Sequence, residues 1–227
     1  MDEAEDRMWW YRALHARLLD ALRGTHGQIL DAGCGTGGFL ARLRVSTPDC
    51  VGVEWSEAGV IRAARKSGAP LVRGSVNALP FSDSSFGAVV SADVLCHAAV
   101  TPRLAVAEMA RVLRPGGRLV INMPAYAWLH SAHDRHVHNA RRVTAGVLRE
   151  WLDGAGLVGV RTRYWNGLLL PLMVIQRKLL NRGAAASDVA PFSPWLNATF
   201  QGVAALERGS RLALPFGGSV LAVGTLP

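Results

Sequence analysis

The sequence predicts an α/β fold in which helices pack on a parallel sheet. Short apolar segments with strand character alternate with helical segments through the first two-thirds of the chain. Residues 28–40, QILDAGCGTGGFL, show this pattern clearly as a buried strand, a glycine-rich turn and the start of a helix. Half of the 227 residues are apolar, which is enough to bury a full core without disulfides or metal. We therefore expect one α/β domain.

The elements can be placed in order along the chain. Met8, Leu14 and Leu18 recur at helical spacing, which predicts an amphipathic helix from about residue 3 to residue 23. Thr101 and Pro102 are a good cap and first residue for a later helix that ends near residue 113. The other elements expected in the first half are strands at 29–30, 51–55 and 70–74, a helix capped by Ser56 that ends near residue 67, and a strand ending near Val90.

The glycine-rich turn has the size of a nucleotide-binding site. Gly33, Gly35 and Gly37 allow a tight turn and a close approach of a ligand to the backbone. The same glycines would suit a dinucleotide, since Glu54 lies where an acid takes a ribose hydroxyl, about 20 residues on. Asp31 favours another ligand, because a carboxylate there repels a pyrophosphate and attracts ammonium and sulfonium charges. Alternatively, Asp31 caps the amides of its own loop.

Four segments stand in a fixed order: 28–40, with an acid before Gly-x-Gly-x-Gly; 51–55, VGVEW; 74–90, GSVNALPFSDSSFGAVV; and 108–122, EMARVLRPGGRLVIN. Together they resemble the class I S-adenosylmethionine-dependent methyltransferases, most closely the small-molecule branch that includes quinone-biosynthesis C-methyltransferases. The resemblance implies a Rossmann-like three-layer sandwich with a mostly parallel seven-stranded sheet and an antiparallel last strand. It implies S-adenosylmethionine as the cofactor and S-adenosylhomocysteine as the product.

The resemblance also implies which residues bind the cofactor. Glu54 would hold both ribose hydroxyls, and Asp31 would attract the amino group of the methionine moiety. The full set implied is Asp31, Gly33, Gly35, Gly37, Glu54, Trp55, Ser75, Val76, Asn77 and Ser91. Two positions depart from the family pattern, because Ser75 replaces an acid on the adenine side and Gly87 replaces the Asp usual before the fourth strand. Ser75 or Asn77 could still accept a hydrogen bond from the adenine amino group.

A histidine-rich segment, residues 124–144, follows the fifth strand, at the sheet edge where parallel α/β sheets bind ligands. Histidines accept protons near neutral pH, as methylation of a hydroxyl, phenol or activated carbon requires. The expected bases are His133, His136 and His97, in that order, although any one of them could be a surface residue. The expected substrate-binding residues are His130, Asp134, Arg141 and Arg142. The arginines could instead pair with acids, and the histidine spacing fits no standard zinc motif, so no metal is expected.

The last third departs from the usual pattern. Residues 158–165 and 219–225 read as the sixth and seventh strands, and 166–218 intervene with helical stretches at 168–181 and about 195–212. This insertion suits a substrate lid or a dimer contact, or less well a peripheral membrane contact. The N-terminal helix either packs on the sheet or covers the cofactor cleft. We divide the domain into 1–27 (N-terminal helix), 28–124 (cofactor core), 125–165 (substrate loop, helix and sixth strand), 166–218 (insertion) and 219–227 (last strand).

The net charge of +8 raises the question of a nucleic-acid partner. Nearly all of the charge comes from dispersed arginines without interleaved aromatic residues, so RNA or DNA is not expected to bind. The three cysteines have no metal spacing and cannot all pair, which favours a reducing, cytoplasmic compartment. The longest apolar stretch, 168–175, is too short to span a bilayer, and the acidic start does not read as a signal peptide.

The sequence thus predicts direct transfer of a methyl group to a small metabolite, anionic or lipophilic, by O-, C- or N-methylation. Ser91 and Asp93, at the end of the fourth strand, would form the floor of the site, and Asp93 need not be a base. The alternatives are an RNA or protein methyltransferase, a cofactor-binding protein without turnover, and an NAD(P)-dependent oxidoreductase. The last is the least favoured, since a dehydrogenase is not expected to carry the Leu-Pro-Phe and Leu-Arg-Pro-Gly-Gly segments together.

Overall fold

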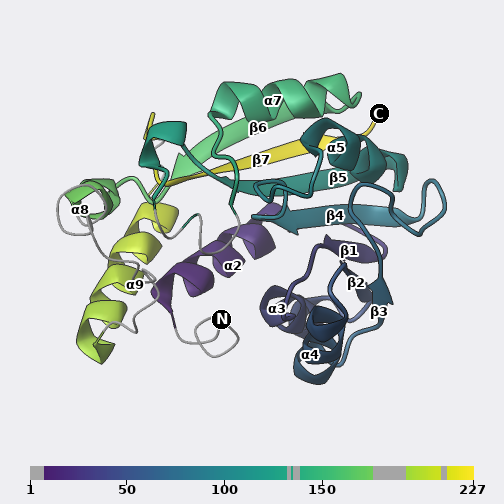
Figure 1. Cartoon of the computed structure of the whole chain (residues 1–227), viewed down its shortest axis with the longest axis horizontal. Coiled ribbons are helices and arrows are strands. Elements are labelled where there is room, and N and C mark those ends of the chain that lie inside the picture. Colours follow the sequence, from purple (N-terminus) through teal and green to yellow (C-terminus); the bar gives the residue numbers. More distant parts are fainter. Residues whose placement is uncertain (1–7, 132–133, 135–138, 176–192, 211–213) are drawn as a thin grey trace.

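The computed structural model describes residues 8–131, 134, 139–175, 193–210 and 214–227. A seven-stranded sheet runs through the molecule in the order β3-β2-β1-β4-β5-β7-β6 (Figure 1). The strands are β1 (Ile29–Ala32), β2 (Cys50–Glu54), β3 (Leu71–Arg73), β4 (Phe86–Ala92), β5 (Leu113–Pro124), β6 (Val158–Trp165) and β7 (Ser219–Thr225). β7 is antiparallel to both of its neighbours, and the pairs from β3 to β5 are parallel. This topology confirms the fold expected from the sequence.

Helices cover both faces of the sheet, so the molecule has three layers (Figure 1). The helices are α2 (Trp9–Ala21), α3 (Gly38–Ser46), α4 (Glu57–Ser67), α5 (Pro102–Arg111), α7 (Ala145–Gly154), α8 (Leu170–Ile175) and α9 (Pro194–Gly209), with a 3-10 turn η1 (Ala127–Leu129). On one face, Met109 of α5 and Leu148 of α7 join a core cluster with strand residues such as Ile121. On the other, Leu18 of α2 and Leu40 of α3 share a second cluster with further strand residues.

The ends of the elements follow local sequence signals. Ser56 accepts a hydrogen bond from the Gly59 amide at 3.3 Å and so caps α4, as its position predicts. Thr144 caps α7 in the same way, through the Val147 amide. The Leu-Arg-Pro-Gly-Gly segment forms an irregularity inside β5, because the pairing shifts from Phe86 with Leu113 to Ala88 with Arg118.

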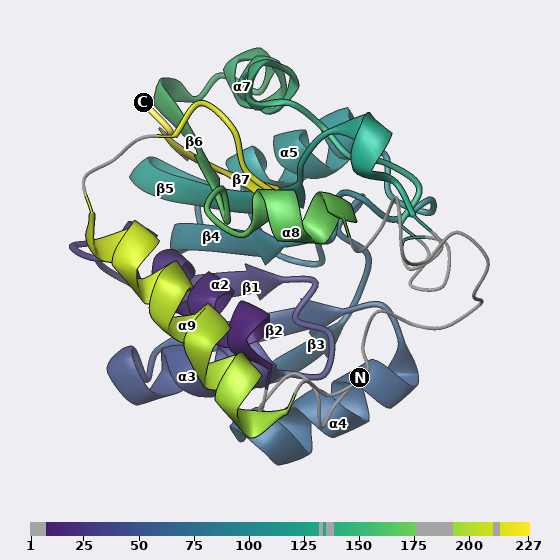
Figure 2. The same cartoon turned by 90° about the vertical axis from the view of Figure 1, so that its left-hand side faces the viewer.

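The N-terminal helix and the insertion lie against each other at one side of the sheet. Figure 2 shows α9 running beside α2, with α8 next to the ends of the strands. The Trp9 amide donates to Asn197 Oδ1 at 2.8 Å, and the Trp9 ring packs edge-on against Phe200. The expected helical stretches of the insertion are present as α8 and α9, although residues 176–192 and 211–213 lie outside the described part of the chain.

Glu207 of α9 joins these elements to the end of β6. Its buried carboxylate accepts hydrogen bonds from the amides of residues 166, 167 and 168 at 2.6, 2.9 and 3.0 Å. It also pairs with Arg17 of α2 at 3.4 Å, and the Arg17 guanidinium lies 4.7 Å from the centre of the Trp165 ring. Glu207 therefore fixes the turn after β6 relative to both helices. In the part of the chain that the structure describes, no helix combines the length and apolar character needed to cross a membrane.

Candidate active site

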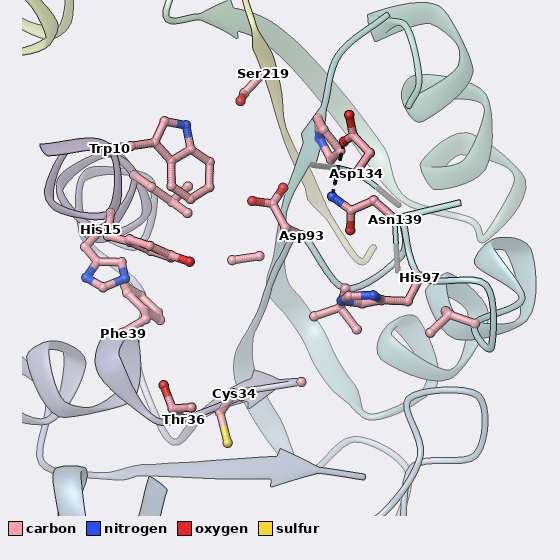
Figure 3. A pocket seen from close by; sticks show the side chains of 18 of the residues that line it. Trp10, His15, Cys34, Thr36, Phe39, Asp93, His97, Asp134, Asn139 and Ser219 are labelled. Atoms are coloured by element: carbon pink, nitrogen blue, oxygen red, sulfur yellow. Dashed lines mark hydrogen bonds between the residues drawn. The ribbon is translucent and has the colours of Figure 1, made fainter. Parts of the chain in front are cut away.

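A cavity of about 1020 Å³ opens at the carboxyl ends of the parallel strands. Its walls come from the ends of β1, β2 and β4, from the loop after β3, from α2, and from the insertion. Figure 3 shows Asp93 near the middle, with Trp10, His15 and Phe39 on one side and His97 and Asn139 on the other. The cavity therefore lies where α/β sheets of this kind bind ligands.

The glycine turn forms one end of the cavity. Gly33 and Gly35 line it with φ of 86° and 56°, and the amides of Gly33 and Cys34 bond to the Val53 carbonyl at 2.9 and 3.0 Å. A Cβ at Gly33 would lie 2.5 Å from the Val94 side chain, whereas a Cβ at Gly35 would meet nothing within 4 Å. Gly35 therefore presents bare backbone to the cavity.

Gly37 has a different place from the one predicted. It precedes α3 with φ of 87°, and a Cβ there would lie 2.7 Å from Ala63 Cα of α4. It is not among the residues that line the cavity. The third glycine of the motif thus allows the close packing of α3 on α4, and its contact with the cofactor stays a prediction.

Glu54 is held rigidly at the end of β2. Its Oε2 accepts from the Gly35 amide at 3.1 Å, and its Oε1 accepts from the Ser56 amide at 2.8 Å. Both oxygens keep a lone pair for a further donor, because a carboxylate offers about four acceptor positions. Trp55 follows with 73% of its surface exposed and also lines the cavity.

The segment after β3 contributes Ser75, Val76 and Asn77 to the lining. The Ser75 hydroxyl accepts from the Asn77 amide at 3.1 Å. The Asn77 side chain donates to the Ala99 carbonyl at 3.0 Å and accepts from the Thr101 amide at 2.9 Å. Asn77 therefore ties this segment to the start of α5, in addition to any contact it makes with a ligand.

Two predicted cofactor residues at the strand ends differ in position. Asp31, at the end of β1, is buried and lines the cavity. Ser91 is fully buried in β4, donates to the Ala32 carbonyl at 2.9 Å, and does not line the cavity. The Ser91 hydroxyl therefore joins β4 to β1 instead of facing the cavity, and its assignment to the cofactor stays a prediction.

Asp93 stands directly after β4 with φ of 55°, a conformation that Asp tolerates better than most residues. Its Oδ1 accepts from Asn122 Nδ2 at 2.9 Å, and Asn122 Oδ1 accepts from Trp165 Nε1 at 2.8 Å. Burial raises the pKa of Asp93 to about 7, against the Asn122 hydrogen bond and the charge of Arg142, which lower it. Asp93 can therefore gain and lose a proton near neutral pH, which position in the sequence did not reveal.

The predicted bases and substrate histidines fall in three groups. His97 lines the cavity (Figure 3). His130 is not among the lining residues, and its Nε2 lies 3.0 Å from the Asn139 carbonyl oxygen, within its own loop. His133 and His136 lie outside the described residues. Of the histidines in the described part of this loop and the β4 end, His97 alone reaches the cavity.

The acidic and basic residues of the loop bind one another. Arg142 places Nε and Nη2 at 3.0 and 2.7 Å from Asp134 Oδ1, and both side chains are almost fully buried. Asp134 Oδ2 accepts from the amide and hydroxyl of Ser131. Both members of the pair border the cavity. The alternative in which an arginine pairs with an acid therefore holds for Arg142.

Arg141 directs its guanidinium to backbone carbonyls, and its role in substrate binding stays a prediction. Its Nη1 donates to the carbonyls of residues 95, 97 and 100 at 2.8, 2.7 and 2.8 Å. It is not among the residues that line the cavity. Arg141 instead fixes the loop between β4 and α5, which carries His97.

The cavity also has an apolar lobe, to which the N-terminal helix and the insertion contribute as two of the expectations from sequence would have it. The residues that form it are Trp9, Trp10, Leu14, Phe39, Leu169, Leu172, Met173 and Phe200. They come from α2, from α3 and from two parts of the insertion, so no local pattern groups them; the adjacent tryptophans of α2 and the apolar stretch 168–175 were the signals visible in the sequence. Asn166 also lines the cavity, with φ of 60° and 4% of its surface exposed. Among the described residues, nothing donates a hydrogen bond to its Oδ1.

Comparison with known proteins places the chain in a family. A sequence family described as "Methyltransferase domain" matches residues 30–121. A demethylmenaquinone methyltransferase from Mycolicibacterium paratuberculosis is 31% identical over 199 residues, which cover 76% of this chain and 84% of the relative. The enzyme of the same name from Mycobacterium bovis is 33% identical over 183 residues, covering 72% and 75%.

A solved structure shows the same fold. The geranyl diphosphate C-methyltransferase of Streptomyces coelicolor, solved with Mg²⁺, geranyl diphosphate and S-adenosyl-L-homocysteine, aligns with a TM-score of 0.67 and 16% identity, over 95% of this chain and 79% of that one. The fold, the glycine turn with Glu54 at the end of β2, and the similar proteins all indicate the same family. The chain belongs to the class I S-adenosylmethionine-dependent methyltransferases.

Proposed function

We propose that the protein methylates a small molecule that has an apolar body and a polar, hydrogen-bonding group. The observation that carries this proposal is the lining of the cavity, in which one set of residues combines the glycine turn, Asp93 and the apolar lobe. Its volume of about 1020 Å³ lies at the upper end of ordinary ligand sites, roughly 300–1,000 Å³. There is room for a cofactor and an acceptor together.

The glycine-turn half fits S-adenosylmethionine. Gly35 offers backbone without a Cβ, beside the two oxygens of Glu54, which backbone amides hold in place. Glu54 would bind the ribose hydroxyls, and Asp31 would attract the ammonium group of the methionine moiety. The adenine ring of the cofactor would lie beside Trp55, Ser75, Val76 and Asn77. When bound, the cofactor supplies a methyl carbon on a positively charged sulfur.

The other half suits an apolar acceptor. Its walls are aromatic and aliphatic, and the burial of an isoprenoid or alkyl group there would be favoured by about 25 cal/mol per Å². No described residue donates a hydrogen bond to the buried Asn166 Oδ1. A hydroxyl or amino group of the acceptor would supply this hydrogen bond. The names of two similar proteins give demethylmenaquinone and geranyl diphosphate as the compounds on which they act. Both compounds combine an apolar chain with a polar head.

The cofactor part of the proposal is tested by titration calorimetry with S-adenosylmethionine and, separately, with NAD⁺ and NADP⁺. Glu54→Gln should weaken S-adenosylmethionine binding about tenfold to a hundredfold, since hydrogen bonds to a charged group contribute about 1.5–3 kcal/mol. Glu57→Gln is the matched control, because that exposed side chain pairs with Arg73 at 3.2 Å and does not line the cavity. Binding of a dinucleotide without S-adenosylmethionine would refute the proposal.

The acceptor part is tested by transfer of a radiolabelled methyl group to three probes. Two carry an apolar chain: 2-geranyl-1,4-naphthoquinol and geranyl diphosphate. The third, 1,4-naphthoquinol, has the ring of the first probe without the chain. We expect label in a probe that carries the chain, with a higher kcat/KM than for the chainless ring. No transfer to any probe, or equal transfer with and without the chain, would contradict the role of the apolar lobe.

A further inference from the structure

We propose that Asp93 is the catalytic residue that accepts the proton lost by the methyl acceptor, and that Asn122 and Trp165 are positioning residues that orient its carboxylate. This inference rests on the proposed function and adds the proton path to it. Sequence reasoning had placed the base among the histidines and had given Asp93 no such role. The geometry around Asp93 favours the carboxylate.

The first step is the placement of the carboxylate. Asp93 follows β4 directly, and its amide donates to the Asn122 carbonyl at 3.0 Å, which extends the pairing with β5. The left-handed backbone at Asp93 then turns the chain out of the sheet and directs the side chain into the cavity (Figure 3). The carboxylate thus faces the cavity that the glycine turn and the apolar lobe also line.

The second step is its orientation. Trp165 Nε1 can only donate, so its 2.8 Å contact fixes Asn122 Oδ1 as the acceptor and turns Asn122 Nδ2 toward Asp93 Oδ1. Trp165 is itself held by the Trp10 ring at 5.9 Å and by the Arg17 guanidinium at 4.7 Å. No described residue donates to Asp93 Oδ2. That oxygen is available to a group in the cavity.

The third step concerns the charges that surround Asp93. Arg142 and Asp134 face it from the loop after β5, and their opposite charges largely cancel because they pair at 2.7 Å. Cys96, on the loop of Asp93 itself, stays a thiol, because burial raises its pKa. His97 and His15 line the same cavity from the β4 loop and from α2. Desolvation dominates this balance and raises the pKa of Asp93 to about 7, which suits a general base at neutral pH.

The proton balance is simple. The nucleophilic atom of the acceptor forms a bond to the methyl carbon, and the methyl–sulfur bond breaks with its electron pair remaining on sulfur. The proton of the acceptor hydroxyl, phenol or activated carbon goes to Asp93 Oδ2 and afterwards to solvent. No oxidant, reductant or metal takes part in this scheme.

The test combines a spectroscopic and a kinetic measurement on the full-length protein. Carboxyl ¹³C NMR of protein labelled at Asp should show a resonance that titrates near pH 7 and is missing from Asp93→Asn. With the geranyl naphthoquinol probe, kcat should fall below pH 7 in the wild type. Asp93→Asn should lose about 10²- to 10⁴-fold in kcat, with S-adenosylmethionine binding changed by less than about threefold. Asp153→Asn, on the exposed side of α7, is the matched control.

The positioning residues have their own readout. Asn122→Leu removes the hydrogen bond that lowers the pKa of Asp93, so the fall of kcat at low pH should begin at a higher pH than in the wild type. Trp165→Phe, which is the variant to use where Asn122→Leu does not fold, should shift this fall in the same direction to a smaller extent. A midpoint near pH 4 for Asp93, or Asp93→Asn with the wild-type rate and acid limb, would overturn the proposal. A wild-type protein that binds S-adenosylmethionine but methylates no probe would refute the proposed function, and the role of Asp93 would fall with it.

Discussion

Glu207 provides a sharp test of how the insertion shapes the site. Its carboxylate receives three amide hydrogen bonds from residues 166–168 and one from Arg17. Glu207→Gln keeps the length of the side chain but replaces one oxygen with an NH₂ group that faces backbone donors. It also leaves the buried Arg17 without a countercharge.

The expected cost is large. Removal of one partner from a buried ion pair costs about 3–5 kcal/mol, because the remaining charge stays desolvated. Burial already lowers the pKa of Arg17 to about 10, which shows that its surroundings disfavour the charge and that Glu207 offsets only part of this. For a domain of this size, such a loss lowers the melting temperature by about 6–20 °C, at roughly 2–4 °C per kcal/mol.

Urea unfolding followed by circular dichroism measures this cost, with Glu57→Gln as the exposed control. The double variant Arg17→Leu/Glu207→Leu separates two roles of Glu207. If Glu207 only neutralised Arg17, the double variant would regain most of the wild-type stability, as apolar replacements of buried pairs often do. We expect it to stay at least about 2 kcal/mol less stable, because three backbone amides lose their acceptor. Full recovery in the double variant would refute this reasoning.

Two further predictions follow from the geometry. Gly37→Ala should destabilise the fold by about 2–5 kcal/mol in urea unfolding, since its Cβ would lie 2.7 Å from Ala63 Cα at φ of 87°. Gly35→Ala should cost only about 1–2 kcal/mol but weaken S-adenosylmethionine binding at least about tenfold in calorimetry, because its Cβ projects into the open cavity; equal stability losses in the two variants would contradict the separate roles of these glycines. Asp93→Asn should gain stability over the wild type as the pH rises. The folded-state pKa of about 7 lies above the ordinary 3.8, so the contribution of Asp93 to the stability of the wild type is greatest below about pH 4 and falls by up to about 4 kcal/mol as the pH rises through 7. Unfolding curves at pH 4.5, 6 and 8 measure the difference in unfolding free energy between Asp93→Asn and the wild type. A difference that is constant with pH would disprove the burial of charge at Asp93.

Much of the fold could be predicted because its signals are local. The bounds expected for β6 and β7, 158–165 and 219–225, are those of the structure, since turn residues flank both strands. The caps Ser56 and Thr144 start helices where their spacing indicates. The glycine turn and Glu54 could be paired from sequence because β1 and β2 are adjacent parallel strands whose ends lie side by side.

The site was predictable only in part, for a physical reason. Ser91 is a good candidate by position, but its hydroxyl donates to the Ala32 carbonyl of the neighbouring strand β1. Arg141 and Arg142 are neighbours of the same type, yet one holds the loop after β4 and the other pairs with Asp134. Sequence position does not tell on which side of the chain such a side chain will lie.

By itself, the sequence determined the α/β class and the glycine turn with Glu54 at the next strand end, since each depends on residue types at short spacing, and the resemblance of four segments to a known family implied the full topology. Only the tertiary structure decided the other walls of the cavity. Asp93, Asn122 and Trp165 come from the ends of three different strands, and the apolar lobe joins α2 to an insertion more than 140 residues away in the chain. The burial that raises the pKa of Asp93 exists only when these parts pack together, because desolvation is a property of the folded surroundings and not of the residue.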